Sequence, residues 1–294
     1  MTNLLLLILC FFVGVLARRT RALPEDSHRA INAWVMFVSL PALVLRAIHD
    51  APLDGVAVAE AALLWLVFFV PAAVVWFTSR SKAWACVALC GGLCNTAFVG
   101  LPLLEALGGK QVLGVATVAD QLGAFVALFA LGIPFAAAVS GARVSVGKVV
   151  RGLVTRPALW ALVLAVVLKP VTFPPAFEGV LDRLAAMLSP LALASVGWSL
   201  DVRALKGNGV RLLTGLSWKL VAAPAMVCAI LYLWRGGIGE TERIVVSQAA
   251  MAPMVTAGVV ASDYDLEPGL AAAFIALGVP LSLVTVPLWW QLLG

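Results

Sequence analysis

The chain has 294 residues, of which 63% are hydrophobic and 12% are charged, and its mean hydropathy is +1.05. A soluble domain carries roughly 25% charged residues, so this chain has too few polar side chains to cover a surface in water. The net charge of +5 comes without a basic stripe or an aromatic platform, and we therefore expect no nucleic-acid partner. The composition predicts an integral membrane protein surrounded by lipid.

Apolar runs recur along the chain, each long enough to cross a hydrocarbon core of about 30 Å. In the first run, Arg18 and Arg19 follow the apolar stretch, whereas a signal peptide carries its positive charge in front. We therefore expect this run to stay in the protein as a span. The ten predicted spans are residues 2–17, 29–48, 56–78, 83–108, 111–138, 149–169, 179–200, 209–234, 243–262 and 268–292.

Lysine and arginine are distributed unevenly between the two sides that this topology defines. The side reached after the first span carries thirteen of them: Arg18, Arg19, Arg21, Arg29, Arg80, Lys82, Arg143, Lys148, Arg151, Arg156, Arg203, Lys206 and Arg211. The other side carries six: Arg46, Lys110, Lys169, Arg183, Arg235 and Arg243. Because basic residues gather on the cytoplasmic side, we expect both termini on the outer side.

Two proline pairs suggest that the chain contains an internal repeat. Pro41 and Pro190 are 149 residues apart, and Pro102 and Pro253 are 151 apart. Five spans is an odd number, so the second copy must be inverted relative to the first, which is typical of secondary transporters. We predict a first five-helix repeat at residues 1–138, a short cytoplasmic linker at 139–148 and a second, inverted repeat at 149–294.

The fourth and ninth spans each combine a central proline with glycine and neutral polar side chains. Proline removes a main-chain donor and clashes with the preceding turn, and in lipid such a break survives only where it faces protein or a watery cavity. The N-terminus of a half-helix offers free N–H groups to a carboxylate. We therefore predict breaks at Pro102 and Pro253; the alternative is a pair of ordinary proline kinks. The predicted substrate-binding residues are Asn95, Thr96, Pro102, Gln248, Pro253 and Thr256.

The segment Asn95-Thr96-Ala97-Phe98-Val99-Gly100-Leu101-Pro102-Leu103 resembles the N-T-x-F-x-G-x-P-L signature of the auxin efflux carrier family. Weaker matches are Leu40-Pro41-Ala42-Leu43, Asp120-Gln121, Lys219-Leu220 with Pro224, Gln248 to Pro253 and Leu266 to Leu283. The resemblance implies an all-α polytopic fold of ten transmembrane helices related to sodium/bile-acid and sodium/proton antiporters. In that fold helices 4 and 9 are broken and cross, and a scaffold is built from spans 1, 2, 6 and 7. It also implies a small organic anion as substrate. The long loop of plant members is missing, which fits a bacterial protein.

Asp120 and Lys219 are the ionisable residues that lie deepest inside predicted spans. An isolated charge at mid-membrane costs at least about 2.5–3.5 kcal/mol, so such residues usually face the interior and often serve function. Asp120 is a candidate for proton coupling or ion coordination; the alternative is a carboxyl group hydrogen-bonded between helices. Lys219 could attract the anion, pair with a carboxylate or extend toward the cytoplasmic surface.

The predicted function is a secondary transporter that moves a mono- or dicarboxylate across a bacterial plasma (inner) membrane by alternating access. The alternatives are a polytopic membrane enzyme and an anion channel. We do not expect an enzyme, because neither H-E-x-x-H nor G-x-S-x-G occurs. No cofactor or metal is expected, since Cys86, Cys90 and Cys94 share a helix face without a histidine or carboxylate. The sequence leaves open coupling to H⁺ or Na⁺, and whether the protein forms a homodimer.

Overall fold

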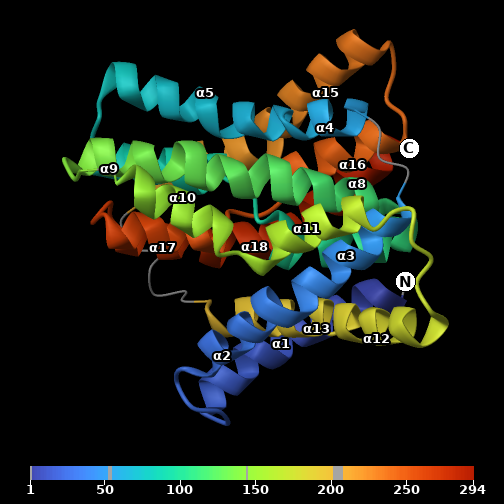
Figure 1. The fold of residues 1–294 in the computed structure, drawn as a ribbon. Helices are drawn as coiled ribbons and strands as arrows, with labels where there is room; N and C mark the ends of the chain where they lie inside the picture. The colour runs from blue at the N-terminus through green and yellow to red at the C-terminus, as the bar shows by residue number, and fades with distance from the viewer. Residues whose placement is uncertain (1, 52–54, 144, 201–207) are drawn as a thin grey trace.

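The computed structural model describes residues 2–51, 55–143, 145–200 and 208–294, which form helices and one isolated pair of extended residues. Figure 1 shows their arrangement. The first half of the chain contains α1 (Thr2–Thr20), α2 (Ser27–Trp34), η1 (Val35–Ser39), α3 (Leu40–Asp50), α4 (Gly55–Ala61), α5 (Leu63–Thr78), α6 (Lys82–Gly92), η2 (Thr96–Gly100), α7 (Leu101–Gly108), η3 (Lys110–Val112), α8 (Leu113–Val118), η4 (Ala119–Phe125), η5 (Leu128–Gly132) and α9 (Ile133–Ser140). The second half contains α10 (Val146–Val154), α11 (Pro157–Val167), α12 (Pro175–Ala186), α13 (Leu188–Trp198), α14 (Gly209–Ser217), η7 (Trp218–Ala222), α15 (Ala223–Arg235), α16 (Glu240–Ala249), α17 (Val255–Asp263) and α18 (Pro268–Leu292).

The helices have the length and surface that lipid requires. Within the described residues, six continuous helical segments are long and apolar enough to cross a membrane: Ser27–Asp50, Ala57–Thr78, Lys110–Ser140, Pro175–Trp198, Gly209–Arg235 and Pro268–Leu292. Large apolar side chains lie on the outside of the bundle; Phe77, Leu213 and Leu233 are 83%, 71% and 82% exposed. Such exposure would be unfavourable in water and is favourable against hydrocarbon.

A span that was predicted to be continuous is divided in the structure. Residues 149–169 were expected to form a single helix, but α10 ends at Val154 and α11 begins at Pro157. The ring of a proline disfavours helical geometry in the residue before it, and Arg156 accordingly has extended backbone, with φ −86° and ψ 117°. Arg156 is thereby placed at the N-terminus of α11 rather than in the middle of a helix.

Four prolines of the helical segments follow widened, π-helical turns, whereas Pro71, Pro280 and Pro287 lie inside continuous α-helices. The turns η1, η2, η5 and η7 each end two residues before a proline, which is Pro41, Pro102, Pro134 or Pro224. A wider turn moves the preceding carbonyl away from the proline ring and avoids the clash that would break an α-helix. The predicted break at Pro102 is therefore wrong, because the chain stays helical from Thr96 to Gly108.

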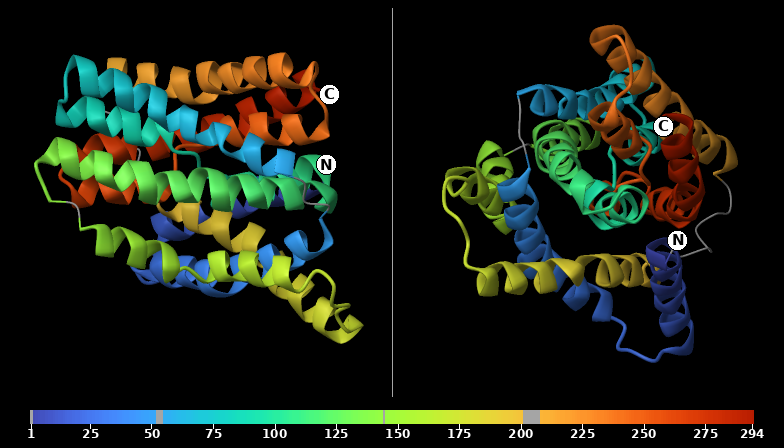
Figure 2. Two further views of the ribbon diagram at one scale, coloured as in Figure 1. Left: turned by 45° about the horizontal axis from the view of Figure 1, so that its top comes forward. Right: turned by 90° about the vertical axis from the view of Figure 1, so that its right-hand side faces the viewer.

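The helices form two groups that pack side by side (Figure 2). The first group, which we call the scaffold, contains α1, α2, α3, α11, α12 and α13; the second, which we call the core bundle, contains α4 to α9 and α14 to α18. In the scaffold α1 and α13 pack backbone to backbone. A Cβ on Gly14 would lie 2.0 Å from the Ala194 carbonyl oxygen, and one on Gly197 would lie 2.1 Å from that of Phe11. Close contact through small residues is the usual way in which membrane helices associate.

Two basic residues from the predicted cytoplasmic side contact segments that follow other helices. Lys82, the first residue of α6, forms an ion pair of 2.6 Å with Asp265, between α17 and α18. The Arg18 guanidinium at the end of α1 donates a hydrogen bond of 2.6 Å to the Leu200 carbonyl oxygen after α13. Arg203 and Lys206, which were counted on the same side, lie outside the described residues.

Candidate functional site

Two helix breaks meet at the centre of the core bundle. The first separates α6 from η2 and contains Leu93, Cys94 and Asn95; the second separates α16 from α17. The Asn95 N–H donates to the Ala252 carbonyl oxygen at 2.8 Å, and the Met254 N–H donates to that of Leu93 at 3.0 Å. The two extended segments run antiparallel and thereby satisfy each other's main-chain groups, as irregular backbone must inside a membrane.

The half-helices that follow the two breaks begin at a common cavity. The cavity has a volume of about 190 Å³, and its wall includes Asn95 and Thr96 at the start of η2 and Val255 and Thr256 at the start of α17. Neither N-terminus is capped by a side chain. The first N–H groups of a helix have no partner within the helix, and its N-terminus carries a partial positive charge. This arrangement suits an anion.

Asn95 contributes a further unused donor to this site. Its side chain is 3% exposed, and its amide nitrogen Nδ2 has no hydrogen-bond partner among the described residues. A buried donor without a partner costs free energy, so its presence beside a cavity points to a ligand that accepts the bond.

Asp120 lies on η4 at the wall of the same cavity, and its carboxylate is engaged on both oxygens. Thr96 Oγ1 donates to Oδ1 at 2.5 Å, and Gln121 Nε2 donates to Oδ2 at 2.7 Å. Since Thr96 opens its half-helix, the carboxylate lies at the positive end of that helix, where an anion is stabilised. Asp120 thus compensates the partial positive charge at the N-terminus that begins with Thr96. No side chain among the described residues caps the other N-terminus, that of α17.

We call the place where the two extended segments pair the crossing. Lys219 lies on its other side, near the ends of the half-helices that precede the breaks. It belongs to η7 and is fully buried. Its ammonium group donates to the carbonyl oxygen of Ala249, the last residue of α16, at 3.2 Å and to Cys94 Sγ at 2.6 Å. A cation is stabilised at the negative C-terminal ends of helices. Two of the roles predicted for Lys219 do not hold: it forms no ion pair with a described carboxylate and it does not reach the surface. Attraction of the anion stays a prediction, and Lys219 does not itself line the cavity.

Three of the predicted binding residues do not line the cavity. Gln248 is fully buried behind the crossing, where its Nε2 donates to the Ala116 carbonyl oxygen at 3.0 Å. Its Oε1 lies so close to Gly100 that a Cβ there would be 2.3 Å away. Pro253 sits in the second break and Pro102 inside a helix, and both help to shape the crossing. Asn95, Thr96, Asp120 and Thr256 do line the cavity.

The structure adds cavity residues that sequence analysis did not single out. The scaffold contributes Asn32, Ser195, Ser199 and Arg156, and the core bundle contributes Gln121. Ser195 Oγ donates to Asn32 Oδ1 at 2.6 Å, which links α2 to α13 beside the cavity. Asn32, Ser195 and Ser199 are missed because their spans show no unusual pattern. Gln121 gives a sequence signal through its place beside Asp120 in the family match, and Arg156 through its place directly before a proline that starts a helix.

Interrupted helices are tolerated inside lipid where they line a polar cavity. Here such a cavity lies between two groups of apolar helices whose outer surface suits lipid. The fold and the site together are those of an integral membrane protein, and the comparisons with known proteins give its family.

A family model described as "Membrane transport protein" matches residues 1–137 and 140–290. An uncharacterized transporter of Methanothermobacter thermautotrophicus is 26% identical over 300 residues, which cover 98% of this chain and 96% of the relative. The uncharacterized transporter YfdV of Escherichia coli K12 is 24% identical over 303 residues, covering 98% of this chain and 95% of the relative. The chain belongs to this membrane transport protein family, that of the auxin efflux carriers, as the segment from Asn95 to Leu103 predicted. The family and the names of the relatives support a transporter and point away from an enzyme.

Proposed function

We propose that the protein is a secondary active carrier that moves a small organic anion, a mono- or dicarboxylate, by alternating access. The observation that carries this proposal is the meeting of two half-helix N-termini, without side-chain caps, at one cavity beside the unused Asn95 donor. One water needs about 10–15 Å³ of such a cavity. The volume of about 190 Å³ therefore suits a molecule of a few carbon atoms.

The proposed movement is that of the core bundle against the scaffold. The cavity at Asn95 lies between the two groups, and a second cavity of about 360 Å³, lined by Arg46, Glu105 and Asp182, lies between the same groups farther along α3. Leu40 lines the first cavity and Leu43 the second, so α3 passes from one to the other within a turn. In our proposal these cavities are the two halves of one pathway, open to opposite sides in turn.

The topology that we propose has ten spans in two inverted repeats and both termini on the outer side of a bacterial inner membrane. Helix breaks in matching places of the two halves, after α6 and after α16, support the repeat. The positive-inside rule supports the orientation. Ser199 lines both the cavity at Asn95 and a third cavity that contains Arg18 and Arg19. The anion cavity would therefore open toward the cytoplasm.

We further propose that the coupling ion is a proton and that Asp120 carries it. Asp120 is a buried carboxyl group in the cavity wall, and an anion can bind beside it at least cost when the carboxyl group is neutral. Sodium is the less favoured ion because the ammonium of Lys219 already occupies the negative end of α16 at the crossing.

Transport in liposomes tests the proposal. The purified protein would be reconstituted, and uptake of radiolabelled acetate, malonate and succinate measured with an inward and an outward proton gradient. We expect saturable uptake of at least one of these anions that is faster when unlabelled anion is present on the opposite side. Flux that rises linearly without saturation would indicate a channel, and the absence of flux for all three anions would refute the proposal.

A further inference from the structure

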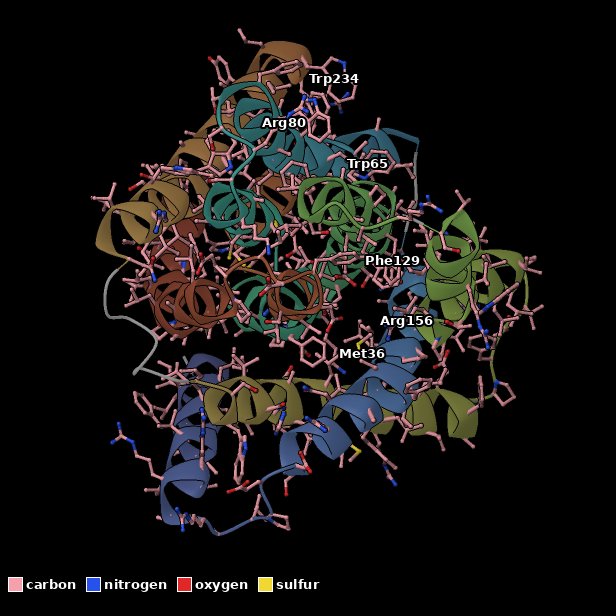
Figure 3. All side chains as sticks on the ribbon, turned by 90° about the vertical axis from the view of Figure 1, so that its left-hand side faces the viewer. Met36, Trp65, Arg80, Phe129, Arg156 and Trp234 are labelled. Carbon is pink, nitrogen blue, oxygen red and sulfur yellow. The ribbon has the colours of Figure 1, made fainter. Side chains whose placement is uncertain are left out.

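Arg156 is placed where the scaffold faces the anion cavity. It is half-buried, lies directly before Pro157 at the N-terminus of α11, and lines the cavity. Figure 3 shows Arg156 and Met36 on different scaffold elements around the space beside the core bundle. Asn95 lines the same cavity from the core bundle.

The guanidinium of Arg156 has no anionic partner in the part of the chain that the structure describes. Among the residues that the structure describes, none offers it a carboxylate within 4.0 Å or a side-chain hydrogen bond. Of the described residues that line the cavity, only Asp120 and Arg156 carry a formal charge. Both oxygens of Asp120 are already engaged by Thr96 and Gln121. Arg156 is thus the one cation of this wall with its hydrogen-bonding capacity unused.

Phe129 holds Arg156 at the wall. The guanidinium carbon lies 5.9 Å from the centroid of the Phe129 ring, within the range of a cation–π contact. The ring in turn packs against α10 at Gly152, where a Cβ would lie 2.3 Å from Phe129 Cε1. Gly152 therefore lets the ring approach the backbone, and the ring supports Arg156 without neutralising its charge.

We propose that Arg156 binds a carboxylate of the transported anion and is the scaffold's specificity-determining residue. This inference rests on the proposed function and adds to it the group that selects for negative charge. A planar guanidinium can donate two parallel hydrogen bonds to one carboxylate. The core bundle contributes Asn95 and the N-terminus of α17, so a bound anion lies between positive groups on the two moving parts. Without an anion, those groups repel each other when the parts approach.

A double-mutant-type cycle, in which the arginine is changed in the protein and the carboxylate is changed in the ligand, tests this assignment. Wild type, Arg156→Gln and Arg156→Lys would be titrated calorimetrically with acetate, malonate and succinate, and with acetamide, malonamide and succinamide, in which every carboxylate is replaced by an uncharged amide. For the acid that wild type binds most tightly, we expect Arg156→Gln to weaken binding roughly 10- to 100-fold, as for a lost charge-assisted hydrogen bond. Binding of the matching amide should change far less. Arg156→Lys keeps the charge but loses the two parallel N–H donors of the guanidinium. Its affinity for the acid should lie between those of wild type and Arg156→Gln.

Arg151→Gln is the matched control, because Arg151 is exposed on α10 and is not part of the cavity wall. It removes the same charge from the same region and should leave both ligands unaffected. If Arg156→Gln weakens the binding of acid and amide equally, or weakens the binding of neither, the assignment of Arg156 is overturned while the proposed function stands. If wild type binds none of the acids, the proposed function fails as well. Should Arg156→Gln fail to fold, the comparison of acid and amide on Arg156→Lys decides in the same way.

Discussion

Replacement of Asn95 by alanine separates a binding role from a structural one. The side chain is 3% exposed and its Nδ2 has no partner among the described residues. Its main-chain N–H, by contrast, joins the two breaks through the Ala252 carbonyl oxygen at 2.8 Å. Asn95→Ala removes the unused donor and keeps the main-chain bond, so the crossing should persist.

The expected effects on binding and on stability have opposite signs. A hydrogen bond from Nδ2 to a carboxylate is worth about 1.5–3 kcal/mol, and each 1.4 kcal/mol is tenfold in affinity. The dissociation constant for the anion should therefore rise about 10- to 150-fold. A buried donor without a partner costs about 1–3 kcal/mol in the empty protein. Removing it should leave the melting temperature of the ligand-free protein equal to or above that of wild type.

The assay is calorimetric titration of the anion together with thermal unfolding in detergent. Asn32→Ala is the control, because Asn32 lines the same cavity but its Oδ1 already accepts a bond from Ser195 Oγ. This variant should melt at a lower temperature and bind the anion with a smaller loss. A lower melting temperature of Asn95→Ala with unchanged affinity would show that Asn95 supports the fold, and our assignment of the site would be refuted.

Three further predictions address coupling and packing. Asp120→Asn should abolish accumulation driven by a pH gradient but retain anion exchange in liposomes; unchanged gradient-driven uptake would remove Asp120 from the coupling step. Replacement of Na⁺ by choline should leave the uptake rate of wild type unchanged, because Lys219 supplies the cation at the crossing, and strict sodium dependence would contradict this. Gly197→Leu should destabilise the protein by about 1–3 kcal/mol or more through overpacking against α1, measured by thermal unfolding. Gly179→Leu, where a Cβ would meet no atom within 4 Å, should have little effect, and equal melting temperatures would argue against close packing at Gly197.

The class of protein and the region of the site were predictable from sequence because they depend on patterns that are local in the chain. Apolar runs and the segment from Asn95 to Leu103 predicted a membrane protein of the auxin efflux carrier family, and the family model confirms it. The break near Pro253 was also placed correctly, because the chain is extended there.

The predicted break at Pro102 was wrong for a physical reason. Proline perturbs a helix, but the chain has two responses, a break or a wider turn. A break frees main-chain groups that need hydrogen-bond partners, and Leu93 and Asn95 find such partners on the opposite extended segment. The π-helical turn before Pro102 keeps its hydrogen bonds within the helix and needs no outside partner. Sequence alone does not tell which residues will meet such a partner. The same limit explains why Arg156 was assigned only to the cytoplasmic surface, since its place in the cavity wall depends on contacts across 27 residues with Phe129.

The crossing sorts helix ends by charge, and this sorting favours a carrier of anions. Lys219 compensates the negative end of α16 at Ala249, and Asp120 compensates the positive end at Thr96. The positive end of α17 and the Arg156 guanidinium remain without a counter-ion among the described residues. In a low dielectric, uncompensated charges of one sign are costly to bring together. In the proposed mechanism an anion between them removes that cost, so that closure of the core bundle on the scaffold would be favoured when the site is loaded and opposed when it is empty. A fixed pore has no such dependence on occupancy, and for this reason the distribution of charges supports alternating access more strongly than the existence of the cavity does.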